Sequence, residues 1–382
     1  MTQKIFTRDF ILCFFAYFAF GFVFNILVPT LPVYLSRLGS NEVEIGILIG
    51  SFAVFSLVLR PFVGKALLRI PEKTFMIAGG LLYTFTSLAY LFASPFWPFL
   101  VVRVFQGVGY AFFNTASFTL IAHISSGTHR GQSLSYFYLA FNLSSVLAPS
   151  LGMFLINHFG FTHLFLVCTG LSLCSLFVTG KLRGRQVTPL ENRSVEDGFL
   201  LSRKAVPPSM VGFFSLFIFG ALTAFFPLYA INHGVANPGL FFTTTGMTIL
   251  LCRALGGKIV DLYSKEKIIL RCLPIYIIAM IILAFSKTLP MFILVAFIYG
   301  IGPAFLVPAL AAYTLDRVGP SRGPAMGTFQ AVTDLGLTMG PVIMGVIVHA
   351  TSYPIMFLCL ALAGIVNLSY CYFFVIKQRM NL

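Results

Sequence analysis

Long apolar stretches constrain this sequence more than any other feature. The residues from Phe10 to Val33 and from Ile268 to Phe285 form continuous apolar runs, without the polar–apolar alternation of a half-buried strand. A helix needs about 20 apolar residues to cross a bilayer, whereas the strands of a membrane β-barrel alternate. Because only these two structures satisfy backbone hydrogen bonds within lipid, the sequence predicts membrane-spanning helices.

The composition supports this prediction. Hydrophobic residues make up 58% of the chain and charged residues 9%, against about 25% charged in soluble domains. A soluble enzyme, a disordered chain, a collagen and a disulfide scaffold are therefore excluded. The seven cysteines lie in apolar runs without paired metal-ligand spacing, so we expect them to be small buried side chains.

The length of 382 residues accommodates about a dozen helices with short connections. A polar segment then divides the chain into a six-helix bundle at 1–181, a cytoplasmic linker at 182–206 and a second six-helix bundle at 207–382. The twelve helices are expected near residues 9–35, 44–68, 74–93, 96–122, 131–156, 161–181, 207–232, 239–259, 267–286, 289–315, 324–348 and 352–376.

The distribution of Lys and Arg predicts the orientation. These residues gather at both termini and in the even-numbered loops, whereas the odd-numbered loops hold only Arg37 and Lys287. Positive charge marks cytoplasmic loops, so both termini are expected in the cytoplasm. The net charge of +14 is then an orientation signal rather than a nucleic-acid surface. Short loops favour a bacterial inner membrane.

The two halves repeat one another. Four motifs return in the same order, 192 to 195 residues later: Pro32-x-Tyr34 as Pro227-x-Tyr229, Arg60-x-x-x-Gly64 as Arg253-x-x-x-Gly257, Gly107-Val-Gly109 as Gly300-Ile-Gly302, and Arg130-Gly131 as Arg322-Gly323. Both halves begin on the same side, so the repeats are parallel. Their relating axis runs along the membrane normal, which predicts a cavity between them near the midplane.

At these motifs the chain resembles the major facilitator superfamily of transporters over essentially its whole length. The segment from Arg60 to Arg69 resembles the family's signature between helices 2 and 3, and Gly257-Lys-Ile-Val-Asp261 has its Gly-x-x-x-Asp spacing. Arg103-Val-Phe-Gln106-Gly107 resembles the helix-4 signature of many proton-coupled members. The resemblance implies the major facilitator fold and alternating access, with no enzymatic activity.

Two departures from the family pattern leave the direction of transport open. Leu68 stands where the first loop signature normally has an acid, and Ala148-Pro149 only partly matches the antiporter signature of helix 5. We expect proton-coupled efflux, by an antiporter, of a small amphipathic or anionic organic solute. A proton-independent facilitator or an importer of a metabolite is the alternative within transport, and a membrane sensor or scaffold is the alternative outside it.

Asp334 and Arg103 are the expected proton-coupling residues. Asp334 is the one acid predicted deep within a helix, where a charge costs about 3 kcal/mol by insertion scales. Desolvation would raise its pKa, so it could load and release a proton. Arg103 stays charged at physiological pH and could bind an anion or modulate a nearby acid. Purely structural roles for both residues stay open.

Other polar residues divide into expected binding and gating groups. Gln106, Tyr110 and Asn114 follow helical spacing and form one stripe, although any one such residue could equally hold helices together. The full set of expected substrate contacts is Asn25, Gln106, Tyr110, Asn114, Asn142 and Gln330. The expected cytoplasmic gate comprises Arg60, Gly64, Arg69, Arg253, Gly257 and Asp261, with Gly64 and Gly257 allowing close helix approach.

No metal site, cofactor or nucleophilic constellation is expected. The six histidines lie near loop ends, and the sequence has no phosphate-binding Gly-x-x-x-x-Gly-Lys-[Ser/Thr] loop for ATP-driven transport. The expected partners are a small-molecule substrate, protons and the lipid bilayer, without nucleic acid. We expect the protein to be monomeric.

Overall fold

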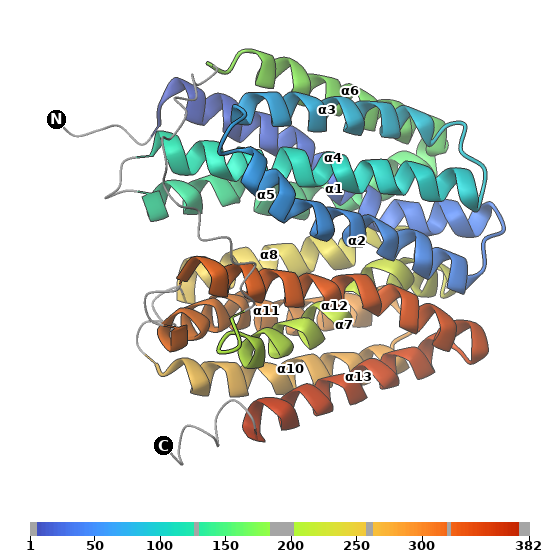
Figure 1. The fold of residues 1–382 in the computed structure, drawn as a ribbon. Helices are drawn as coiled ribbons and strands as arrows, with labels where there is room; N and C mark the ends of the chain where they lie inside the picture. The colour runs from blue at the N-terminus through green and yellow to red at the C-terminus, as the bar shows by residue number, and fades with distance from the viewer. Residues whose placement is uncertain (1–5, 126–129, 184–201, 257–262, 319–321, 374–382) are drawn as a thin grey trace. The chain divides into compact units, whose positions relative to one another are not determined.

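The computed structural model describes residues 6–125, 130–183, 202–256, 263–318 and 322–373. Within these residues it contains twelve α-helices and no strand (Figure 1). The helices are α1 (Arg8–Arg37), α2 (Glu42–Ala66), α3 (Glu72–Ala89), α4 (Trp97–Ile124), α5 (Arg130–His158), α6 (Gly160–Gly180), α7 (Val206–Asn232), α8 (Gly239–Gly256), α10 (Lys265–Phe285), α11 (Leu289–Val318), α12 (Arg322–Ala350) and α13 (Tyr353–Tyr370).

The predicted all-helical class and the twelve helices are confirmed. Ten of the described helices are long and apolar enough to cross a membrane; α3 and α4 fall outside this set. Helix α3 begins with Glu72 and Lys73, while α4 carries Arg103 and Gln106. These polar side chains lower the mean hydropathy of the two helices, and those in α4 belong to the candidate site.

Helices α1 and α7 end in the same way. Gly39 follows the end of α1 with a φ of +88°, and Gly234 follows the end of α7 with a φ of +77°. Glycine adopts this left-handed conformation without the steric cost that a Cβ atom brings, so it commonly terminates helices. The two glycines occupy matching positions in the two sequence repeats.

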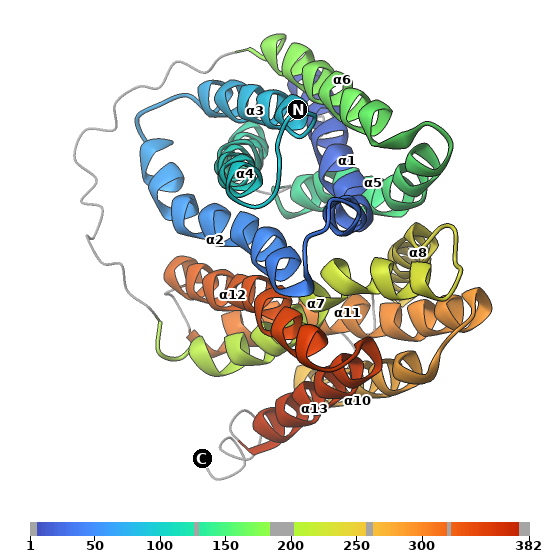
Figure 2. The same cartoon turned by 90° about the vertical axis from the view of Figure 1, so that its right-hand side faces the viewer.

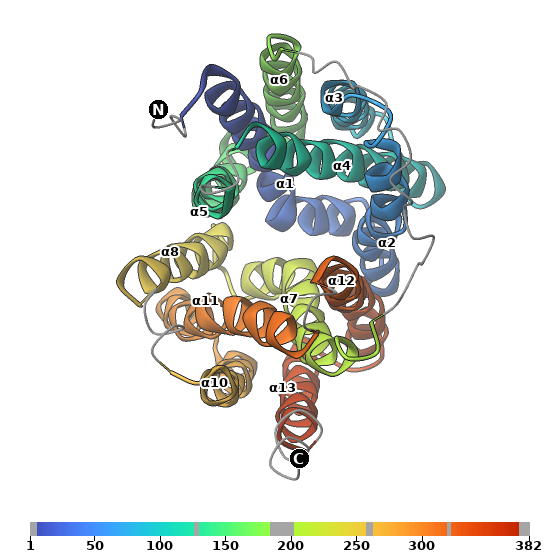
Figure 3. The same cartoon turned by 60° about the vertical axis from the view of Figure 1, so that its left-hand side comes forward.

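The chain divides into two compact units. Unit 1 comprises Met1–Leu38 and Ser51–Val195, and unit 2 comprises Gly39–Gly50 and Glu196–Leu382. In unit 1, α1 packs on α5 and α6, and α3 packs on α4 and α6 (Figure 2). In unit 2, α7 packs on α12 and α13, and α10 packs on α11 and α13 (Figure 3). The same pairs of equivalent helices therefore pack in both units.

Helix α2 contributes to both units. Its first turns belong to unit 2, where they pack closely on α12. The close packing is possible because Gly46 and Gly50 have no side chain at the contact. A Cβ atom on Gly50 would lie 2.8 Å from the carbonyl oxygen of Thr338. The predicted bundles of residues 1–181 and 207–382 kept this helix whole, and their boundaries stay a prediction.

Equivalent tyrosines make equivalent hydrogen bonds in the two repeats. The hydroxyl of Tyr34 donates to the carbonyl oxygen of Tyr90 at 3.2 Å, and the hydroxyl of Tyr229 donates to that of Ser286 at 2.6 Å. Each bond ties the end of the first helix of its repeat to the residues that follow the third. The repeated Pro-x-Tyr motif thus has one structural role in both units.

Equivalent glycines also allow equivalent close approaches. A Cβ atom on Gly107 in α4 would lie 2.5 Å from the carbonyl oxygen of Phe52, and one on Gly300 in α11 would lie 3.0 Å from that of Thr245. Phe52 and Thr245 are themselves 193 residues apart, as are the two glycines. The sequence repeat therefore corresponds to a repeat in packing, because these positions tolerate little more than a hydrogen atom.

Candidate functional site

A buried polar cluster lies in unit 1, between α4 and the end of α3. The guanidinium Nη1 of Arg103 donates to Oε1 of Gln106 at 2.7 Å, and the hydroxyl of Tyr90 donates to the same oxygen at 2.5 Å. Arg103 is 6% exposed, Gln106 1% and Tyr90 0%. One amide oxygen thus accepts two hydrogen bonds and joins the arginine to the tyrosine.

An aromatic ring also contacts this arginine. The Cζ atom of Arg103 lies 4.8 Å from the centre of the Phe52 ring in α2. A cation over an aromatic face is stabilised by about 2 kcal/mol when the pair is desolvated. Gln106 and Phe52 together hold the guanidinium in one place within an otherwise apolar bundle.

Tyr110 extends the cluster along α4. Its ring centre lies 5.2 Å from that of Phe24, 5.3 Å from that of Phe52 and 5.9 Å from that of Phe20. The Cζ atom of Arg60 lies 6.0 Å from the same ring. The structure therefore brings an expected gate residue, Arg60, to an expected substrate contact.

Asn114 lies one turn further along the same helix. Its side-chain oxygen accepts a hydrogen bond from the hydroxyl of Tyr17 at 3.3 Å. The stripe predicted from helical spacing is thus flanked by α1 and α2 within unit 1, and both helices contribute aromatic rings to it.

Asn25 uses its amide group within the bundle. Its Nδ2 donates to the carbonyl oxygen of Gly21 at 2.9 Å and to the hydroxyl of Ser144 at 3.0 Å, and the residue is 6% exposed. The bond to Ser144 joins α1 to α5. Asn142, also expected to contact substrate, is half-buried on α5, where its backbone carbonyl accepts a hydrogen bond from Ser145.

The expected proton carrier lies in unit 2. Asp334 is half-buried on α12, and its backbone carbonyl accepts a hydrogen bond from the hydroxyl of Thr338 at 3.3 Å. Gln330 lies one turn away and is exposed. Helical spacing places Gln330, Asp334 and Thr338 along one face of α12.

The expected gate residues are not brought together as one cluster within either unit. Arg253 on α8 donates from Nε to the carbonyl oxygen of Ala304 in α11 at 3.4 Å. Its equivalent in the first repeat, Arg60 on α2, approaches the Tyr110 ring in α4. Arg69 is exposed in the turn after α2. Gly257 and Asp261 lie outside the described residues.

The described residues show no close helix approach at Gly64. A Cβ atom on Gly64 would meet no described atom within 4 Å, because the residue lies on an exposed side near the end of α2. Close approach occurs instead at glycines such as Gly50, Gly107 and Gly300.

One buried acid is not predicted from the sequence. The side chain of Glu72 is 3% exposed, and its carboxylate contacts Nδ1 of His123 in α4. Glu72 is the first residue of α3, so it is buried at a helix end, and the placement of Asp334 deep within a helix stays a prediction. Lys265 and Asp316 make a contact at the equivalent positions of the second repeat, with the charges exchanged. Matching charged residues at the repeat offset would have found both pairs.

No group of three or more His, Cys, Asp or Glu side chains lies within reach of a common metal ion in the described part of the chain. In unit 1 the polar groups of the site are the guanidinium groups of Arg103 and Arg60 with amide and phenol groups, and unit 2 separately carries a carboxyl on α12. Such groups bind and orient solutes or exchange protons.

Within its described residues the protein has twelve helices in two sequence repeats of six, and Arg103 in the fourth helix is buried among polar partners. These features are typical of a polytopic membrane transporter. The family model of the Major Facilitator Superfamily matches residues 13–285 and 237–380. The chain belongs to this superfamily, whose members are transporters and not enzymes.

Known relatives are similar over most of their length. The staphylopine export protein of Staphylococcus aureus is 25% identical over 374 residues, covering 92% of this chain and 91% of the relative. The quinolone resistance protein NorA of the same species is 23% identical over 353 residues, covering 90% and 91%. The crystal structure of the human organic anion transporter MFSD10 has a TM-score of 0.69 at 17% identity, covers 95% of this chain and 99% of that one, and shares the fold.

Proposed function

We propose that the protein is a proton-coupled exporter of small amphipathic or anionic organic solutes, working by alternating access between its two six-helix repeats. The buried cluster of Arg103, Gln106 and Tyr90 carries this proposal. A fixed positive charge buried among apolar helices is costly and marks a functional site in membrane proteins. The name of the staphylopine export protein supports export, and that of the quinolone resistance protein supports an organic solute.

The proposed solute site runs along α4. Gln106, Tyr110 and Asn114 offer hydrogen-bonding groups, while Phe20, Phe24 and Phe52 surround Tyr110 with apolar rings. Aromatic surface combined with a few placed polar groups is typical of sites for amphipathic molecules. Arg103 would attract an anionic group of the solute. Asn142 and Gln330 are proposed as further contacts, and the amide of Asn25 as a support for α1.

Asp334 is the proposed proton carrier. A carboxyl that is desolvated in one conformation and wetted in another has different proton affinities in the two states. Proton binding would then favour one state by its differential affinity. Arg103 is the proposed modulator of this exchange, because it keeps its charge throughout.

The remaining features of the proposal concern gating and placement. Arg60, Gly64, Arg69, Arg253, Gly257 and Asp261 are proposed to stabilise the cytoplasmic closure. The charge distribution supports cytoplasmic termini, and the bacterial relatives support an inner-membrane location. We propose that the protein works as a monomer.

Proton movement in proteoliposomes tests this function. Purified protein is reconstituted with a pH-sensitive dye inside, and zwitterionic, anionic and cationic amphipathic solutes are added outside. Solute-triggered proton flux is expected for one of these classes. Equilibration of labelled solute at equal rates with and without a proton gradient would instead identify a facilitator, and absence of any solute flux would identify a sensor or scaffold.

A further inference from the structure

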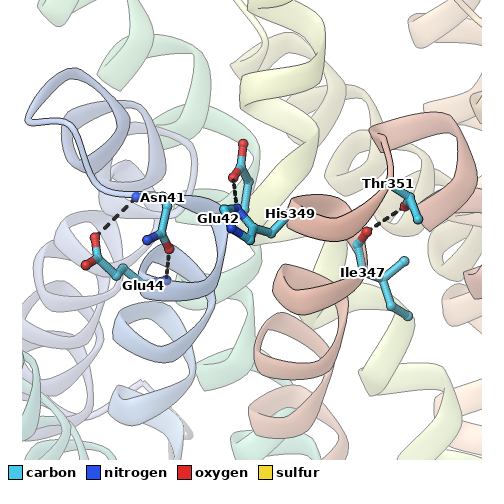
Figure 4. Close-up of polar contacts among 6 residues, drawn as sticks. All are labelled: Asn41, Glu42, Glu44, Ile347, His349 and Thr351. Carbon is cyan, nitrogen blue, oxygen red and sulfur yellow. Dashed lines mark hydrogen bonds and ion pairs between the residues drawn. The ribbon is translucent and has the colours of Figure 1, made fainter.

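An ion pair joins the first turn of α2 to the last turn of α12. Nδ1 of His349 lies 3.2 Å from Oε2 of Glu42, and both residues belong to unit 2 (Figure 4). The side chains are 56% and 32% exposed, respectively. The proposed function uses neither residue, and the two lie 307 positions apart in the chain.

The glycines beside this pair set the distance between the two helices. Gly46 and Gly50 face the carbonyl oxygens of Pro341 and Thr338, and a Cβ atom on Gly345 would lie 2.6 Å from the carbonyl oxygen of Glu42. The α2–α12 seam denotes Gly46, Gly50 and Gly345 together with the α12 backbone at Thr338 and Pro341. Small residues let helices in a membrane approach closely, so the seam holds the backbone of Glu42 against α12.

A capping box fixes the beginning of α2. The backbone N–H of Asn41 donates to Oε2 of Glu44 at 3.2 Å, and the N–H of Glu44 donates to Oδ1 of Asn41 at 2.9 Å (Figure 4). This reciprocal arrangement satisfies backbone groups that a helix start leaves without partners. The carboxylate of Glu44 is used in the cap, and that of Glu42 contacts α12.

We propose that Glu42 and His349 form a pH-sensitive latch that closes the α2–α12 seam on the side of the membrane opposite the termini. Histidine changes its charge between about pH 5 and 8. Protonated His349 attracts the Glu42 carboxylate, whereas the neutral ring keeps at most a hydrogen bond. Acidification of the outer medium therefore closes the latch.

The neighbouring titratable groups do not reverse this sign. Tyr353, at the beginning of α13, interacts electrostatically with Glu42 and is an uncharged phenol over the pH range of the latch. Glu44 is a second acidic residue in the first turn of α2, with the same sign of charge as Glu42. On α7, the ring of Phe225 contacts the seam at Gly345, and it carries no charge.

The latch rests on the proposed function only in its consequence for transport. If outward opening requires α2 and α12 to part at this end, a protonated His349 slows that opening. An exporter would then release solute more slowly into an acidic medium, even though the proton gradient driving it is larger. The inference thus concerns regulation of the transport cycle by external pH.

Distance measurement between the two helices tests the latch without solute or gradient. Spin labels are attached to the variants Val43→Cys and Val346→Cys in a background lacking the seven native cysteines. Distances between the labels are recorded by double electron–electron resonance in nanodiscs, with the same pH on both sides. The closed-to-open ratio is expected to rise about fivefold from pH 8 to pH 5, which corresponds to an exposed ion pair. His349→Gln and Glu42→Gln should abolish the dependence, and His349→Lys should stay closed at both pH values.

His233→Gln is the matched control. His233 follows α7, and its Nδ1 contacts the carbonyl oxygen of Tyr229 rather than an acid, so the pH dependence should persist in this variant. A wild-type distance that does not change with pH, or a change that persists in His349→Gln, would overturn the latch. Solute exchange by the same preparation is scored separately, so that loss of exchange with an intact pH response would overturn the proposed function and leave the latch standing.

Discussion

Arg103 donates a hydrogen bond of 2.7 Å to the side-chain oxygen of Gln106, one turn further along α4. The acceptor is a neutral amide, so this contact orients the guanidinium without neutralising its charge. Tyr90 donates to the same oxygen and fixes the amide in turn. In the proposed cycle this geometry presents a permanent, oriented cation to a solute anion or to an acid.

Arg103→Lys is expected to lower solute transport about tenfold, the equivalent of one lost hydrogen bond to a charged group. Lysine keeps the charge but lacks the planar fork that reaches Gln106 while stacking on Phe52. Initial transport rates in proteoliposomes measure the effect. Arg37→Lys is the control, because Arg37 also lies over an aromatic ring, that of Phe161, but at the end of α1. Wild-type rates in Arg103→Lys would contradict the assigned role.

Gly107→Ala is expected to destabilise the protein by about 1–3 kcal/mol, the usual cost of overpacking. The added methyl group would lie 2.5 Å from the carbonyl oxygen of Phe52, so α2 and α4 must move apart. Thermal unfolding in detergent should show a lower midpoint. Gly170→Ala, where a Cβ atom meets nothing described within 4 Å, should leave the midpoint equal or raise it. Equal losses in both variants would argue against the packing explanation.

Glu72→Lys is expected to destabilise the first repeat, because it replaces the acidic partner of His123 with a cation at a buried position. The double variant Glu72→Lys with His123→Asp recreates the Lys265–Asp316 pair of the second repeat. It should recover about 1 kcal/mol of the loss, since contacting residues couple by 0.5–3 kcal/mol. Unfolding midpoints of the four proteins give the coupling. Strictly additive effects would show that the two side chains do not interact.

Tyr110→Ala is expected to raise the KM for aromatic solutes about tenfold, because the variant loses about 1–1.5 kcal/mol of ring contact. Asn25→Ala should act differently. Its amide joins α1 to α5, so the variant should unfold at a lower temperature while the ratio of KM values among solutes stays unchanged. Transport kinetics with two solutes of different size separate the outcomes. A changed solute preference in Asn25→Ala would make that residue a substrate contact.

Hydropathy and repeats predicted the helices and the equivalence of the two halves, because apolar length and the recurrence of glycine, proline and tyrosine are properties of local sequence. Contacts between distant residues escaped prediction. Glu72 begins a helix and looks solvent-exposed in sequence, yet its partner His123 lies 51 residues away. The division of α2 at Gly50 depends on the backbone of α12, which no feature of α2 alone specifies.

Asn25 and Tyr110 illustrate the same limit within the candidate site. Both are polar residues in apolar helices, and both were expected to contact substrate. The structure distinguishes them by their partners. The amide of Asn25 bonds Ser144 and joins two helices, whereas the ring of Tyr110 packs against Phe24 in an aromatic cluster.

In the proposed function, Asp334 couples solute movement to proton movement. The most direct measurement compares solute exchange with gradient-driven accumulation in proteoliposomes containing Asp334→Asn, with Asp316→Asn at the exposed end of α11 as control. Asp334→Asn is expected to exchange labelled solute at a near-normal rate but not to accumulate it under a proton gradient, whereas the control variant should do both. Accumulation by Asp334→Asn at the wild-type level would contradict the account.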